Sequence, residues 1–100
     1  MVTNVYAKYI ICYDIENVKN RNKLYKSLKN FGLVPIQYSV FFGDLNKAEL
    51  SAVKRLIKEI LDEKTDKCIW AACNLTVKEI KSCFGYKNFK FIEADGYETI

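Results

Sequence analysis

The stretch from Tyr9 to Asn22 reads Y-I-I-C-Y-D-I-E-N-V-K-N-R-N, and it decides the predicted fold. β-Branched and aromatic residues dominate the segment around it, which predicts a central strand over Tyr6 to Ile15, buried on both faces. Asp14 stands at the carboxyl end of this strand, where α/β layers commonly expose functional groups. A basic, helix-compatible segment follows within a few residues. The junction of strand and helix is therefore the leading candidate site.

Working outward, the whole sequence has the size and composition of one domain, residues 1–100. It has 100 residues, half of them hydrophobic, and a net charge of +4. A single core needs about this length. The sequence shows no signal-peptide pattern and no apolar run long enough to span a bilayer. These features predict a cytoplasmic protein without a membrane partner.

Cysteine and histidine usage narrows the chemistry. The chain has four cysteines, no C-x-x-C pair and no histidine. We expect reduced thiols that serve packing, at Cys12, Cys68, Cys73 and Cys83. Without histidine, the commonest general base and transition-metal ligand are both absent. Hydrolytic chemistry in this chain would have to rest on carboxylates, a metal ion or the phenols.

The segment after the junction predicts a helix over Val18 to Phe31. Asn17 is a suitable N-cap, and Gly32 suits a left-handed terminator. At about 100° per residue, the apolar side chains share one arc. The opposite arc holds Lys19, Lys23, Lys26 and Lys29. This basic face is typical of phosphate binding, although a solvated helix surface is an equally common explanation.

Arg21 falls in the middle of the apolar arc of this helix. A guanidinium in that position needs an anion to offset its desolvation, and Asp14 or a bound phosphate are the nearest candidates. The alternative is that Arg21 extends past the helix end to reach water.

The segment that follows predicts two short antiparallel strands, Val34 to Gln37 and Val40 to Leu45, with a tight reversal between them. Pro35 cannot donate a ladder hydrogen bond, so the first strand belongs at a sheet edge or begins there. Gly43 suggests a β-bulge. One long bent strand is the open alternative.

The second half of the chain contains the clearest helix. Asn46 and Glu49 resemble a capping box, and an i, i+3, i+4 apolar pattern continues until the helix ends by Glu63. The run from Cys68 to Cys73, which holds the only tryptophan, predicts a second buried strand.

A short helix and a last strand complete the expected elements. Thr76 begins the helix as a second capping box, with Phe84 on its inward face beside Val77 and Ile80. Phe89 to Glu93 alternates as a strand and needs another edge to pair with, which a neighbouring subunit would supply. The order of elements predicts an α+β, ferredoxin-like βαββαβ sandwich with a C-terminal extension.

Two motifs at consistent spacing resemble a known family. The Tyr13-Asp14-Ile15 junction with Arg21-Asn22, followed by Gln37 to Leu45, is similar to the small CRISPR-associated protein of spacer acquisition. This family is the dimeric partner of the CRISPR integrase and is often labelled an endoribonuclease. The resemblance implies a ferredoxin-like homodimer in which two copies of Asp14 face each other and hold Mg²⁺ or another divalent cation. It also implies that the C-terminal strand crosses to the partner.

The resemblance assigns functional positions residue by residue. Tyr13, Asp14, Arg21, Ser39 and Phe41 match the positions that act in this family, with Asp14 as the metal ligand. Some members carry arginines where Lys23 and Pro35 stand in this sequence. Lysine keeps the charge without the bidentate fork, and proline keeps neither.

The residues support hypotheses of different classes. The first is Mg²⁺-dependent cleavage of RNA or DNA through paired Asp14, because a single carboxylate makes a poor magnesium site and a two-fold axis supplies the second. The second is a noncatalytic bridge that binds duplex DNA and the integrase, with phosphate contacts from Arg21 and the basic face. The third is a toxin-like ribonuclease of the virulence-associated type.

Each candidate site residue also has a structural explanation. Asp14 could cap the following helix or pair with Arg21. Tyr13 and Phe41 are more often core residues than catalytic ones, and Ser39 could serve only to shape the turn.

Overall fold

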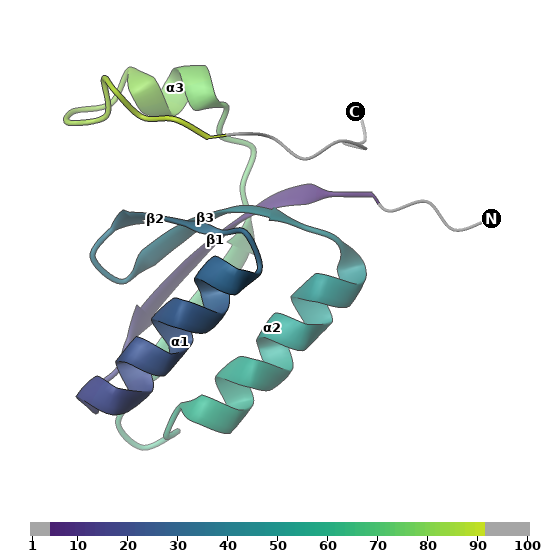
Figure 1. The fold of residues 1–100 in the computed structure, drawn as a ribbon, viewed down its shortest axis with the longest axis vertical. Helices are drawn as coiled ribbons and strands as arrows, with labels where there is room; N and C mark the ends of the chain where they lie inside the picture. Colours follow the sequence, from purple (N-terminus) through teal and green to yellow (C-terminus); the bar gives the residue numbers. More distant parts are fainter. Residues whose placement is uncertain (1–4, 92–100) are drawn as a thin grey trace.

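The computed structural model describes residues 5–91, and in this range a four-stranded antiparallel sheet is covered on one face by two helices (Figure 1). The strands lie in the order β2-β3-β1-β4. Their bounds are β1 Ala7–Asp14, β2 Val34–Gln37, β3 Val40–Leu45 and β4 Lys67–Ala72, and the helices are α1 Val18–Asn30, α2 Lys47–Ile60 and α3 Val77–Lys81. This arrangement confirms the predicted ferredoxin-like fold. No helix among residues 5–91 is long and apolar enough to cross a membrane.

Local sequence signals account for α1. The Asn17 side chain accepts a hydrogen bond from the Asn20 N–H at 2.9 Å, which satisfies one of the free donors of the first turn. Gly32 ends the helix region with a φ of +87°, where a side chain would be strained. Leu24 and Leu28 are fully buried against the sheet. The predicted N-cap and terminating glycine are confirmed, and the inward face is confirmed at Leu24 and Leu28 but not at Val18 and Tyr25, which are exposed.

The β2–β3 hairpin has the predicted strands and reversal, and Pro35 lies on an edge strand as expected. The predicted bulge at Gly43 is wrong, because the register shift falls between Pro35 and Gln37 instead. Gly43 is required for close packing: an added Cβ would lie 2.8 Å from the Leu33 side chain. Proline cannot join the ladder, so the irregularity falls beside it.

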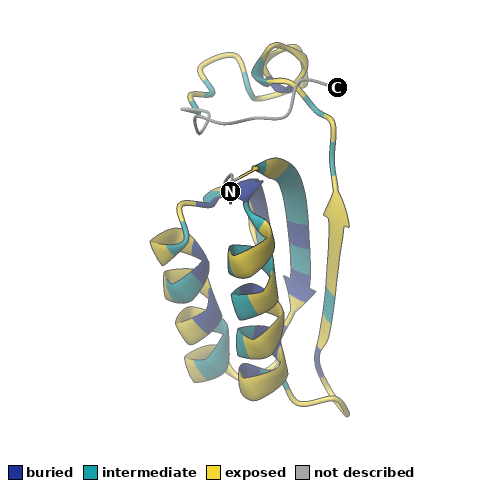
Figure 2. Cartoon of the chain, turned by 90° about the vertical axis from the view of Figure 1, so that its right-hand side faces the viewer, coloured by how far each residue is buried: buried dark blue, intermediate teal, exposed yellow. Residues whose placement is uncertain are grey.

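The core lies between the sheet and the two helices. The strand side chains that face the helices are Ile11 and Tyr13 of β1 and Phe41 and Leu45 of β3. They belong to one core cluster with Val53 of α2. The prediction that β1 is buried on both faces is wrong, because α1 and α2 lie on the same side of the sheet (Figure 2). The alternate residues of β1 are therefore only half-buried.

Strand β4 differs most from its prediction. It was expected to be a buried strand, but among residues 5–91 it pairs with β1 alone and lies at the edge of the sheet (Figure 2). Ile69 is 69% exposed and Trp70 is 38% exposed. Burial raises the pKa of the Cys68 thiol to about 11. All four cysteines are free, but the predicted packing role is wrong for Cys83, which is exposed.

The segment after β4 only partly follows the prediction. Thr76 forms the expected capping box with Glu79, and Ile80 is buried. Phe84 is fully exposed rather than inward, because α3 ends at Lys81 and the helical spacing does not continue. Phe89–Phe91 do not form a strand; Phe91 packs against Phe42 with ring centroids 5.3 Å apart. The rest of the predicted last strand lies outside the described residues.

Candidate functional site

The carboxylate of Asp14 lies at the surface where β1 ends. Asp14 is exposed, while the next residue, Ile15, is 2% exposed and anchors the chain in the core. The Glu16 N–H donates to the Asp66 carboxylate at 3.0 Å. The buried side chain and this hydrogen bond fix the loop that presents Asp14 to solvent.

Asp66 is a positioning residue that the sequence did not reveal. Its side chain is 9% exposed and also accepts hydrogen bonds from the Asp62 N–H at 2.9 Å and the Thr65 hydroxyl at 3.1 Å. The two backbone donors, Asp62 first and then Glu16, lower the pKa of Asp66. Asp66 therefore joins the turn before β4 to the loop after Asp14. Its one sequence signal was an acid inside a polar turn.

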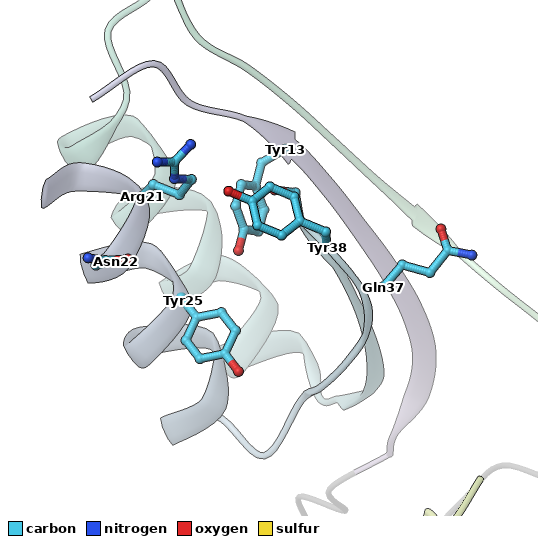
Figure 3. A pocket seen from close by; sticks show the side chains of 7 residues that line it. Tyr13, Arg21, Asn22, Tyr25, Gln37 and Tyr38 are labelled. Atoms are coloured by element: carbon cyan, nitrogen blue, oxygen red, sulfur yellow. The ribbon is translucent and has the colours of Figure 1, made fainter. Parts of the chain in front are cut away.

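A cavity of about 230 Å³ opens between α1 and the tip of the β2–β3 hairpin (Figure 3). It brings together three of the predicted site residues, Tyr13, Arg21 and Ser39. Its lining also includes four residues that were not predicted as site residues: Asn22, Gln37 and Tyr38, which belong to the two motifs, and Tyr25, which does not. Of these, Tyr25 lies one helical turn beyond Arg21, a spacing that could have revealed it.

Tyr13 forms the inner wall of this cavity. It is 7% exposed, and its N–H donates to the Ser39 carbonyl oxygen at 3.0 Å, which ties the hairpin tip to β1. Burial raises the pKa of the Tyr13 phenol, with smaller contributions from the phenols of Tyr25 and Tyr38, and only Arg21 opposes the shift appreciably. The phenol is therefore a hydrogen-bond donor at neutral pH rather than a general base.

Phe41 lies behind the cavity and does not line it. Its side chain is completely buried. Its ring is stacked with Tyr13 at a centroid distance of 6.3 Å and meets the edge of Tyr25 at 5.2 Å. A fully buried ring cannot touch a substrate in the single chain. Phe41 can therefore act at the site only indirectly, by packing against Tyr13 and Tyr25.

The four lysines of the predicted basic face are all exposed along α1: Lys19, Lys23, Lys26 and Lys29. The Lys29 ammonium lies 5.6 Å from the centroid of the Tyr25 ring. Within residues 5–91 no hydrogen bond or ion pair involves the Arg21 guanidinium, so of its two candidate anions Asp14 is not bound to it. The basic side of α1 therefore keeps its charge available for an external anion.

The described part of the chain holds no cluster of three metal-ligating side chains. Asp14 faces Lys67 of β4 in the strand register. Asp14 alone supplies one carboxylate, fewer ligands than a divalent cation usually takes from a protein. The donor set fits Mg²⁺ only when a second Asp14 is added.

A known protein family matches the part of the chain that contains these site residues. Residues 7–80 match the family model described as CRISPR associated protein Cas2. The chain belongs to the Cas2 family. The match covers all four strands and most of α3, so it includes the Asp14 junction and the cavity beside Arg21.

Individual Cas2 proteins are similar over most of the chain. A protein of Francisella tularensis subsp. novicida, named CRISPR-associated endoribonuclease Cas2 1, is 39% identical over 93 residues, which cover 93% of this chain and 95% of that protein. A solved structure described as the crystal structure of cas2 has a TM-score of 0.62 at 32% identity, covering 71% of this chain and 82% of the other. Streptococcus pyogenes Cas2 gives the same TM-score at 25% identity, covering 67% and 86%.

Proposed function

We propose that two copies of this chain form a cytoplasmic homodimer that acts in CRISPR adaptation, binds nucleic-acid phosphates and cleaves RNA through paired Asp14 side chains. The observation that carries the proposal is the exposed Asp14 carboxylate at the end of β1, directly before a helix whose charged residues are all basic. The names of the Cas2 relatives as endoribonucleases favour RNA as the substrate.

The open face of the sheet supports the dimer. By strand register, this face carries the half-buried side chains of Ile10, Cys12 and Val40, and the exposed Ile69 and Ala71. Helices α1 and α2 lie on the opposite face (Figure 2), and within residues 5–91 this face is covered at Phe42, which is buried and packs against Phe91. Contiguous apolar surface of this kind marks an interaction site, and a self-complementary contact about a two-fold axis is the commonest solution. A second copy is therefore the partner that we assign to this face.

The chain's own residues supply charge and position for phosphodiester cleavage. The two Asp14 carboxylates would hold Mg²⁺ or another divalent cation, which supplies Lewis acidity to a reaction that has no histidine to serve as base. Arg21 binds and orients the phosphate through its planar fork. The lysines of α1 offset the charge of the neighbouring phosphates.

The decisive test is cleavage of single-stranded RNA by the purified protein with and without Mg²⁺. Asp14→Ala should lower the magnesium-dependent rate by more than about a hundredfold, since loss of a metal ligand costs more than loss of a second-shell partner. Glu16→Gln is the matched control, because Glu16 is exposed two residues away and contributes its backbone to the fold. An unchanged rate in Asp14→Ala would place the activity elsewhere.

A noncatalytic bridge is the second candidate, and the uniformly exposed lysines of α1 favour it. In this role the dimer binds duplex DNA and the CRISPR integrase without cutting. Affinity for duplex should then fall steeply with salt, and the integrase should be captured by wild-type and Asp14→Ala protein alike. The family match favours both candidates over the toxin-like ribonuclease.

A further inference from the structure

We propose that the cavity between α1 and the β2–β3 hairpin holds one unpaired nucleotide of a nucleic-acid strand, with the base stacked on Tyr38 and its phosphate on Arg21. The proposal rests on the nucleic-acid binding proposed above and adds a defined site to it. It separates single-stranded from duplex ligands, because a paired base keeps both faces within its own stack.

Tyr38 is the stacking ring. Its side chain is 81% exposed although it is large and aromatic. The turn beneath it is well fixed: Ser39 takes the left-handed conformation, with a φ of +64°, and its carbonyl accepts the hydrogen bond from the Tyr13 N–H. An aromatic side chain on an anchored turn is a sequence-tolerant platform for a base.

Arg21 is the phosphate ligand. It is half-buried at the cavity wall, and its guanidinium has no hydrogen-bond or ion-pair partner among residues 5–91. Partial burial of an unpaired guanidinium is costly, and a phosphate oxygen pair offsets this cost through two parallel hydrogen bonds. In Figure 3 the Arg21 side chain projects from α1 and the Tyr38 ring from the hairpin, and both border the cavity.

The size and polar lining of the cavity fit a single nucleotide. The cavity has a volume of about 230 Å³. Sites for drug-sized ligands have ~300–1,000 Å³, so this cavity is limited to a smaller ligand such as one ring system. The phenols of Tyr13 and Tyr25 and the side chains of Asn22 and Ser39 offer hydrogen bonds to base edges. Lys29 lies over the Tyr25 ring, which leaves Tyr38 as the platform for stacking.

The test measures binding of two probes to the full-length protein: a short single-stranded RNA containing 2-aminopurine, and a blunt duplex DNA. Tyr38→Ala should weaken binding of the single strand by about tenfold, within the range expected for loss of one stacked base, and abolish the change in 2-aminopurine fluorescence. Binding of the duplex should not change. Tyr38→Trp should restore both single-strand signals.

Two further variants separate this site from general electrostatics. Arg21→Gln should weaken the single strand more than the duplex, whereas Lys26→Gln should weaken both probes equally. If Tyr38→Ala leaves single-strand binding and fluorescence unchanged, or weakens both probes alike, the nucleotide site is wrong. If the wild-type protein binds neither probe, the proposed nucleic-acid function itself is wrong.

Discussion

Helices α1 and α2 begin in the same way and then differ in charge. Each starts at an asparagine whose side chain accepts an N–H of the first turn, Asn17 in α1 and Asn46 in α2. In α2 the Asn46 N–H in turn donates a hydrogen bond to the Glu49 carboxylate, which completes a capping box. The first turn of α1 contains no acid. Only α2 therefore neutralises its own N-terminal dipole.

Basic side chains of the two helices also differ in the contacts that they make. Lys54 of α2 lies 5.8 Å from the centroid of the Trp70 ring, in a second cavity against β4. Arg21 of α1 has no comparable contact with a ring or an acid among residues 5–91. The sequence of α1 contains basic residues and no acid, whereas α2 also contains Glu49 and Glu59. The acids of α2 offset part of its positive charge, whereas α1 has no acid to offset its own, which favours anion binding on the α1 side.

The largest expected effect comes from removing the core residue that supports the α1 cavity. Phe41→Ala should lower the free energy of unfolding by about 3–5 kcal/mol, since it removes a fully buried ring on which Tyr13 and Tyr25 pack. Urea unfolding measures this cost. Val53→Ala in α2 is the matched control, because Val53 is also buried in the core and makes no ring contact with the tyrosines. If Phe41→Ala costs under about 1 kcal/mol, the cavity does not depend on the core beneath it.

A smaller effect is expected from neutralising the lysines of α1. Lys19→Gln, Lys23→Gln and Lys26→Gln together should reduce the slope of log K against log salt for duplex DNA by about one for each lysine that contacts phosphate. The same measurement on Lys47→Gln, Lys54→Gln and Lys58→Gln in α2 should leave the slope unchanged. If the two triple variants give equal slopes, α1 does not bind DNA phosphates in preference to α2.

The parts of the fold that were predictable depend on local signals. The limits of α1 follow from Asn17 and Gly32, and those of the hairpin follow from Pro35 and the turn at Tyr38 and Ser39. The exposure of β4 was not predictable, because the same apolar sequence pattern occurs in central strands and in edge strands. Its place depends on pairing with β1, which is distant in sequence.

The candidate site was only partly predictable for the same reason. Of the five positions that the resemblance assigned, Tyr13, Arg21 and Ser39 line one cavity and Asp14 and Phe41 do not, and the nearness of Tyr38 to Arg21 became visible only when the hairpin was placed against α1. Asp66 is fifty residues from Glu16, to which it is hydrogen-bonded. No local pattern encodes a contact of that separation.

Removing the helix caps tests the difference between α1 and α2 through a smaller change in stability. Asn17→Ala should destabilise the protein by about 1 kcal/mol, and Asn46→Ala should approach about 2 kcal/mol because the capping box loses its reciprocal partner. Urea unfolding of both variants gives the difference. Equal costs would show that Glu49 adds nothing to the cap of α2.

The smallest effect concerns Asp66, which joins the α2–β4 turn to the loop before α1. Its pKa in the fold is lowered from the ordinary value of 3.8, so its contribution to stability is complete above that value. The contribution is lost as the pH falls below 3.8 through the folded pKa, because protonation weakens acceptance from the Asp62 and Glu16 N–H groups. Asp66→Asn should be less stable at neutral pH and lose less stability on acidification. Glu79→Gln in α3 is the control, since the pKa of Glu79 is also lowered by the hydrogen bonds of its own cap. If Asp66→Asn and wild type lose stability in parallel between neutral pH and acid, the carboxylate does not hold the Asp14 loop, and the backbone alone presents that side chain.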